Sequence, residues 1–87
     1  MSASRGPGPR RHTAAAKDVG HKLAEAARKL YAQAAEILKF AERLEALTKD
    51  TPAWYAGTRA RVEARAALEQ IDELRRTLEQ LGEQLGE

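Results

Sequence analysis

The chain has no cysteine, three prolines and only four aromatic side chains among its 87 residues. Without cysteine it can form neither a disulfide nor a thiolate metal site. No segment approaches the roughly 20 apolar residues of a membrane-spanning helix. The N-terminal region lacks the apolar segment of about 7–15 residues that a secretory signal peptide requires. We therefore expect a soluble, cytoplasmic protein with no membrane span.

Motifs for catalysis are also lacking. The sequence contains no phosphate-binding loop, dinucleotide fingerprint, Ser-His-Asp arrangement or His-Glu-x-x-His. Asp18, His21 and Glu25 have a spacing that can place three side chains on one helix face, where they could hold a metal. The same spacing is typical of the exposed start of a helix, which is the interpretation we favour. We expect that the protein is not an enzyme and that it has no catalytic residue, bound metal or cofactor.

What the sequence does contain is helical periodicity. The chain is 43% apolar and 32% charged, a balance typical of a soluble helical protein. Between residues 14 and 49, apolar residues recur in alternating steps of three and four, which indicates a heptad row. This first row is Ala16, Val19, Leu23, Ala26, Leu30, Gln33, Ile37, Phe40, Leu44 and Leu47. We interpret it as the contact with a second helix.

A helix break follows at Lys49-Asp50-Thr51-Pro52. Thr51 is a candidate N-cap, and proline is tolerated at the first helical position because its missing N–H needs no partner there. The same periodicity resumes as Ala53, Gly57, Ala60, Ala64, Ala67, Ile71, Leu74, Leu78, Leu81 and Leu85. The pattern predicts an all-α fold in which residues 13–87 form an antiparallel two-helix hairpin, with helices at about 14–49 and 52–85.

A second apolar row runs beside the first on the N-terminal helix. Its members are Ala24, Ala27, Tyr31, Ala34, Leu38 and Ala41. A helix that contacts only one neighbour needs a single row, whereas a helix in a bundle has a wider apolar face. We interpret this second row as a surplus surface for a partner, together with Tyr55 near the turn.

These features favour a non-enzymatic assembly or adaptor protein. Its partner would be a second copy, giving a homo-oligomer, or the helices of a larger complex, and the hairpin would be completed into a four-helix bundle. Gln33 is the only polar residue of the first row. It either fixes the register of an interface, as a lone polar residue can, or lies at the edge of that interface.

The N-terminal segment supports an alternative function. Residues 1–12 form a Gly-, Pro- and Arg-rich tail that we expect to be flexible. Arg5, Arg10, Arg11 and Lys17 carry positive charge with no acidic residue among the first 17 positions. These side chains could contact nucleic-acid phosphates. Neutralisation by acidic residues near the C-terminus, or contact with a protein, explains the same charges.

A third alternative rests on shape. A cysteine-free helical hairpin with Trp54 and Gly57 near its turn resembles the WXG family of small secreted hairpins. That resemblance implies dimerisation and passage through a specialised export system. The motif differs, because two residues separate Trp54 from Gly57. The family's C-terminal Tyr-x-x-x-acid signal has no counterpart either, since no tyrosine follows Tyr55.

Overall fold

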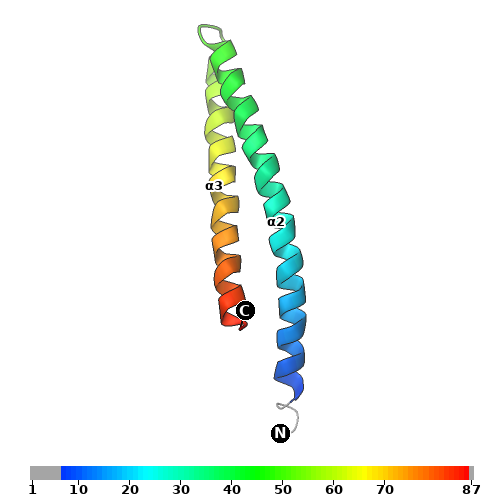
Figure 1. Cartoon of the computed structure of the whole chain (residues 1–87). Helices are drawn as coiled ribbons and strands as arrows, with labels where there is room; N and C mark the ends of the chain where they lie inside the picture. The colour runs from blue at the N-terminus through cyan, green and yellow to red at the C-terminus, as the bar shows by residue number, and fades with distance from the viewer. Residues whose placement is uncertain (1–6, 87) are drawn as a thin grey trace.

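The protein is an antiparallel helical hairpin in the computed structural model, which describes residues 7–86, with side chains from residue 13 onward. Helix α2 spans Pro7–Thr48 and helix α3 spans Trp54–Gln84. The two helices run side by side, joined by a short loop at one end (Figure 1). The molecule measures 70 × 20 × 14 Å. The predicted all-α hairpin is confirmed.

Helix α2 begins earlier than the sequence predicted. It starts at Pro7 instead of residue 14, so part of the expected flexible tail is helical backbone, and residues 1–6 lie outside the described range. Pro7 and Pro9 are compatible with this start because the first four N–H groups of a helix have no intrahelical acceptor. The two helices are therefore unequal, at 42 and 31 residues. The N-terminal end of α2 projects past the end of α3 (Figure 1).

The turn lies where the sequence placed it, but its capping differs. Asp50 adopts a left-handed conformation with φ of 66° and ends α2. The Thr51 hydroxyl donates to the Thr48 carbonyl at 2.6 Å and accepts from the Ala53 N–H at 3.2 Å. Helix α3 starts at Trp54, so Pro52 lies in the turn and is not the first helical residue. The threonine hydroxyl thus organises the turn locally, as Ser and Thr commonly do.

The contact between the helices uses a different row of α2 from the one that we expected. Ala27, Ala34, Leu38 and Ala41 are the buried hydrophobic side chains among the described residues. They belong to a continuous heptad row that contacts α3. This interface row consists of Gly20, Ala24, Ala27, Tyr31, Ala34, Leu38, Ala41, Glu45 and Thr48, all buried or half-buried. The row interpreted as surplus is therefore the intramolecular core.

Helix α3 contributes a matching interface row with the same alternating steps. Its members, all buried or half-buried, are Gly57, Arg61, Ala64, Leu68, Ile71, Arg75, Leu78, Gly82 and Leu85. Gly57 is the buried residue of α3 and lies against Glu45 and Thr48 of α2. Small residues along α2 let the helices approach closely at high packing density, which explains why the alanine-rich row is the one in contact.

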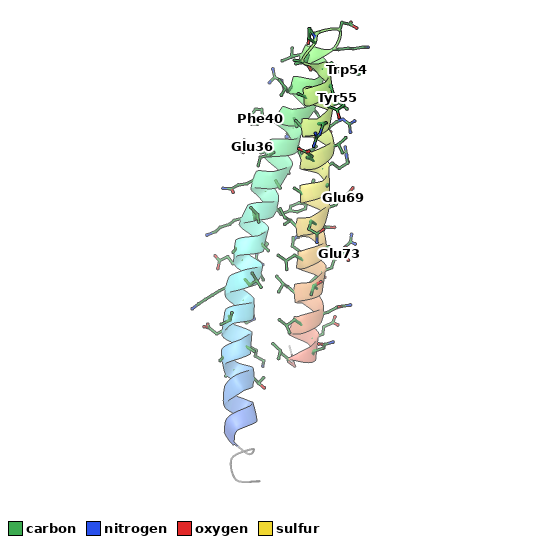
Figure 2. The ribbon with its side chains drawn as sticks, turned by 180° about the vertical axis from the view of Figure 1, so that it is seen from behind. Glu36, Phe40, Trp54, Tyr55, Glu69 and Glu73 are labelled. Carbon is green, nitrogen blue, oxygen red and sulfur yellow. The ribbon has the colours of Figure 1, made fainter. Side chains whose placement is uncertain are left out.

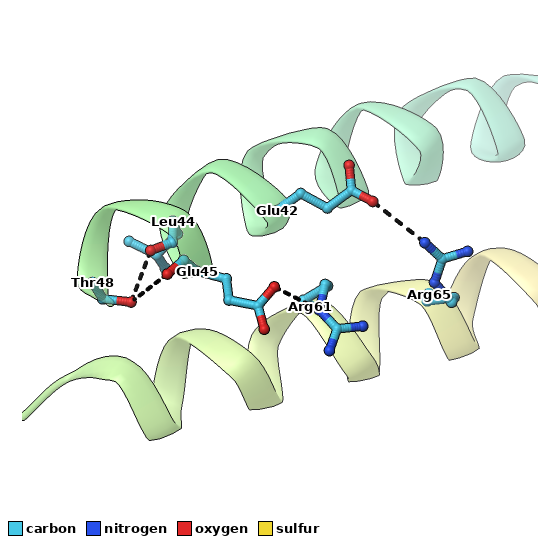
Figure 3. Close-up of polar contacts among 6 residues, drawn as sticks. All are labelled: Glu42, Leu44, Glu45, Thr48, Arg61 and Arg65. Carbon is cyan, nitrogen blue, oxygen red and sulfur yellow. Dashed lines mark hydrogen bonds and ion pairs between the residues drawn. The ribbon is translucent and has the colours of Figure 1, made fainter. Parts of the chain in front are cut away.

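Polar contacts reinforce this pairing (Figure 3). The Arg61 Nε donates to the Glu45 carboxylate at 2.7 Å, and both side chains are mostly shielded from water. Farther from the loop, the Arg75 guanidinium lies 4.6 Å from the centre of the Tyr31 ring, a cation–π contact. The interface row of α2 therefore combines small apolar side chains with charged or aromatic ones that recognise specific arginines of α3.

Candidate functional site

The hairpin has two long edges, and one ion pair identifies which residues share each edge. Glu42 follows the interface residue Ala41, and Arg65 follows the interface residue Ala64. Their side chains meet at 3.3 Å (Figure 3). Residues that follow the interface rows of both helices therefore lie along one edge. Residues that precede the interface rows lie along the opposite edge.

The edge marked by Glu42 and Arg65 is polar. On α3, the residues that follow interface positions include Asp72, Arg76 and Glu79. Asp72 forms an ion pair with Arg76 at 2.9 Å. Such exposed pairs along one helix contribute only about 0.3–0.5 kcal/mol each. Most of this edge is a solvated, charged surface.

The opposite edge is apolar and exposed, and we call it the apolar flank. On α2 it consists of the residues that each precede an interface residue: Val19, Leu23, Ala26, Leu30, Gln33, Ile37, Phe40, Leu44 and Leu47. These are members of the first row of the sequence analysis, which we expected to face α3. Seven of them are large hydrophobic side chains that are 44–73% exposed. Helix α2 does carry one apolar row more than it needs to contact α3, as predicted, but the two rows have the opposite roles. The second row contacts α3, and the first row is exposed.

The position of the flank follows from helix geometry. One residue corresponds to about 100° of rotation around an α-helix. Because every flank residue precedes an interface residue by one, the flank faces about 100° away from α3. Figure 2 shows Phe40, a flank residue, on the side of α2 away from α3. Helix α3 alone cannot cover a surface in that direction.

Covering the exposed flank would contribute a favourable free energy of burial. Complete burial of a Val, Leu, Ile or Phe side chain stabilises a protein by about 1.5–3 kcal/mol. Ile37 is 58% exposed and Phe40 is 61% exposed. A partner that covered either side chain would therefore add roughly half of that burial free energy. Single exposed hydrophobic residues are normal on a protein surface, but a contiguous exposed stripe is typical of an interaction site.

Helix α3 extends the flank at its C-terminal end. Leu74 and Leu81 precede Arg75 and Gly82, so they lie on the same edge as the α2 flank and are half-buried. Where the helices separate, an open hollow of about 380 Å³ lies between Gly20 and Ala24 of α2 and Leu78, Leu81 and Gly82 of α3. At this end the hairpin's own core is thin.

The structure separates Tyr55 from the flank. Tyr55 is 72% exposed and lies close to the loop, beside Trp54 (Figure 2). Seven residues farther along α3, Val62 follows Arg61 and so occupies the polar edge, and the heptad spacing places Tyr55 on that same edge. The α2 row expected to act with Tyr55, namely Ala24, Ala27, Tyr31, Ala34, Leu38 and Ala41, lies between the helices.

The proposed phosphate contacts are largely outside the described side chains. Arg5 lies outside the described residues, while Arg10 and Arg11 are part of the α2 backbone and their side chains are not described. Lys17 is half-buried and lines the hollow between the helix ends, beside Glu79 and Glu83. Lys17 therefore shares the lining of this hollow with two acidic residues.

No metal site is evident in residues 13–86: they contain no group of three or more His, Asp or Glu side chains arranged to hold an ion. Asp18, one of the candidate ligands, forms an ion pair with Lys22 at 3.3 Å. In the described part of the chain, neither helix is long and apolar enough to cross a membrane.

Comparison of the chain with protein-family models, with curated proteins and with solved structures finds no match. The flank is therefore the feature of the molecule from which a function can be proposed.

Proposed function

We propose that the protein is a non-enzymatic helical assembly or adaptor protein that binds helices through its apolar flank. The observation that supports this function is the heptad spacing of seven large, exposed hydrophobic residues along α2. Heptad spacing over this length suits a long, straight helix as the binding partner. An irregular loop or a small ligand would not require periodic contacts.

The direction of the flank supports the same function. A helix at the corner of a four-helix bundle contacts two neighbours at nearly right angles, and its apolar face is correspondingly wide. Helix α2 has one row covered by α3 and a second row about 100° away. Residues on the remaining surface of α2, such as Lys22, Lys29 and Lys39, are exposed and charged. The sequence of α2 therefore suits a bundle helix better than a helix of an isolated hairpin.

Cross-linking from the flank tests this function. A photoreactive residue in place of Ile37, introduced in the cells that make the protein, is expected to link to a helical segment of another polypeptide chain, which peptide mass spectrometry can identify and map. A photoreactive residue in place of Arg76 is the matched control. Arg76 lies on the polar edge with its side chain 70% exposed.

The expected outcome is a mapped cross-link from position 37 and none from position 76. The same mapped peptide should disappear when Leu30 is also replaced by Glu, since that change puts a charge into the flank. Absence of any cross-link from position 37, or equal cross-linking from both positions, would contradict an assembly function of the flank.

A further inference from the structure

We propose that the partner on the flank is a second copy of this chain, with its α2 antiparallel to the first α2 and a two-fold axis close to Gln33. This inference rests on the proposed function, because it names the helix that covers the same flank. It specifies one arrangement among many: α2 against α2, running in opposite directions, with Gln33 opposite its own copy. The result is a four-helix bundle made of two hairpins.

The spacing of the flank supports this arrangement. Val19 and Leu47 are each fourteen residues from Gln33, and Ala26 and Phe40 are each seven residues from it. A two-fold interface makes each contact twice, so that residue i meets residue j and j meets i. An antiparallel pairing about Gln33 therefore sets Val19 against Leu47 and Ala26 against Phe40. It also brings Leu23 and Leu30 of one copy within one residue of the levels of Leu44 and Ile37 of the other.

The sizes of the facing side chains also favour the antiparallel pairing. In the antiparallel pairing the largest flank residue, Phe40, lies opposite the smallest, Ala26. Large and small side chains at facing positions fill a helix interface without voids or clashes. A parallel pairing in register would instead set Phe40 against Phe40 and Ala26 against Ala26, with crowding at one level and a gap at the other.

The polar side chain of Gln33 explains why the two-fold axis would lie at this residue. It is an exposed polar residue near the middle of an otherwise apolar row. If the flank were covered by an apolar surface, the Gln33 amide would be buried without hydrogen bonds, which is costly. An amide has both donors and acceptors, so two copies of Gln33 across a two-fold axis can satisfy each other.

Charges beside the flank are complementary in the same register. Lys29 and Glu36 are both exposed and lie near Gln33 on the outer border of the flank. With the axis at Gln33, Lys29 of one copy comes within one residue of the level of Glu36 of the other, twice per dimer. Farther out, Lys22 comes within one residue of the level of Arg43 of the second copy, a like-charge pair, although Lys22 already has an ion-pair partner in Asp18 at 3.3 Å.

The absence of cysteine from the chain makes a direct test simple. A single Gln33→Cys substitution places one thiol at the proposed axis, where two copies would be close enough for a disulfide. The matched control is Ala26→Cys, also on the flank. In the antiparallel dimer its two thiols would be about 21 Å apart, far beyond the Cβ separation of about 3.5–4.5 Å that a disulfide requires.

We expect the purified full chain to have twice its mass of 9.6 kDa in solution. Oxidation should link Gln33→Cys almost completely and Ala26→Cys only slightly. The double variant Ala26→Cys/Phe40→Cys should link efficiently, because those positions face each other. All of these positions except 40 carry small or polar side chains, and all are exposed, so the hairpin should fold in each variant, which circular dichroism checks.

Three outcomes would overturn the inference. Efficient linking of both single variants would indicate a parallel dimer, and a dimer in which neither single variant links would have another interface. A monomer would exclude the second copy altogether. If the protein is monomeric but Ile37 cross-links to a different protein in cells, the assembly function stands and only this inference fails.

Discussion

Gly57 of α3 packs directly against Thr48 of α2: a Cβ atom at Gly57 would lie 2.5 Å from the Thr48 Oγ1 and 3.3 Å from the Glu45 Cα. Thr48 cannot easily turn away, because its hydroxyl donates to the Leu44 carbonyl at 2.8 Å (Figure 3). The helices therefore approach closely beside the loop, and only glycine fits there.

We expect Gly57→Ala to lower the free energy of unfolding by about 1–2 kcal/mol, because crowding in a packed contact outweighs the better helix propensity of alanine. The matched variant is Gly20→Ala, where the added Cβ would meet only the Leu81 Cδ2 at 3.7 Å. That change should raise stability by up to about 1 kcal/mol. Urea unfolding followed by circular dichroism measures both. Equal effects of the two substitutions would show that the close contact has no energetic role.

Asp50 ends α2 with φ of 66°, a conformation that costs an L-residue energy. Its negative charge also lies near the negative end of the helix dipole. Asp50→Gly should therefore raise the midpoint of thermal unfolding, by an amount equivalent to about 0.5–1 kcal/mol. Asp50→Val should lower it, because a β-branched side chain tolerates positive φ poorly. If Asp50→Val proved as stable as the original chain, the turn would not have this conformation in solution.

The ion pair between Glu45 and Arg61 should contribute more than an exposed pair. Their side chains are 23% and 31% exposed, whereas those of Arg59 and Glu63 are 60% and 62% exposed. A double-mutant cycle with Glu45→Gln and Arg61→Gln should give a coupling energy of about 1 kcal/mol. The same cycle on Arg59 and Glu63 should give about 0.3–0.5 kcal/mol. A larger coupling for the exposed pair would be inconsistent with the structure.

Ile37 and Leu38 are sequence neighbours with opposite roles. Leu38 is 8% exposed between the helices, and Ile37 is 58% exposed on the flank. Leu38→Ala should destabilise folding by about 2–3 kcal/mol, since it leaves a cavity in the core. Ile37→Glu should leave the helical circular dichroism signal in place and should abolish association, which sedimentation measures. The reverse pattern would mean that the first row, and not the interface row, contacts α3.

The variant Gln33→Leu tests whether Gln33 sets the register of the dimer interface at a cost in stability. Replacing a polar residue in an apolar interface commonly raises stability and relaxes register. We therefore expect a higher unfolding temperature for Gln33→Leu, together with new disulfide linking of the Ala26→Cys position in that background. A more stable variant whose linking pattern is unchanged would show that Gln33 lies at the edge of the interface and does not set its register.

Much of the architecture could be predicted from the sequence. The heptad steps and the break at Asp50-Thr51-Pro52 predicted an all-α hairpin, and the structure confirms the fold. The start of α2 was not predicted, because Gly-Pro units are typical of disorder and their tolerance in a first helical turn is a weak signal. The capping of α3 differs for a similar reason, since Thr51 can cap a helix or order a turn with the same hydroxyl.

The sequence predicted that α2 has a surplus apolar row, but it assigned that role to the wrong row. Each residue of the exposed flank precedes by one a residue of the interface row. Both rows of α2 have the same spacing, and the row that continues for longer, with ten members against six, was assigned to the contact with the second helix. The hairpin instead buries the smaller row. A signal for this choice was present in Glu45 and Thr48, which extend the smaller row towards the loop at heptad spacing and have partners in Arg61 and Gly57.

The sequence by itself determined two long helices, the turn between them and the existence of one apolar row more than a hairpin needs. Those features depend on local propensity and on periodicity along one chain. Only the tertiary structure decided which row α3 covers, because that choice depends on how closely two helix surfaces can approach. Alanines on α2, Gly57 on α3 and the Glu45–Arg61 pair make the smaller row the better fit, and they leave Ile37, Phe40 and their neighbours facing outward.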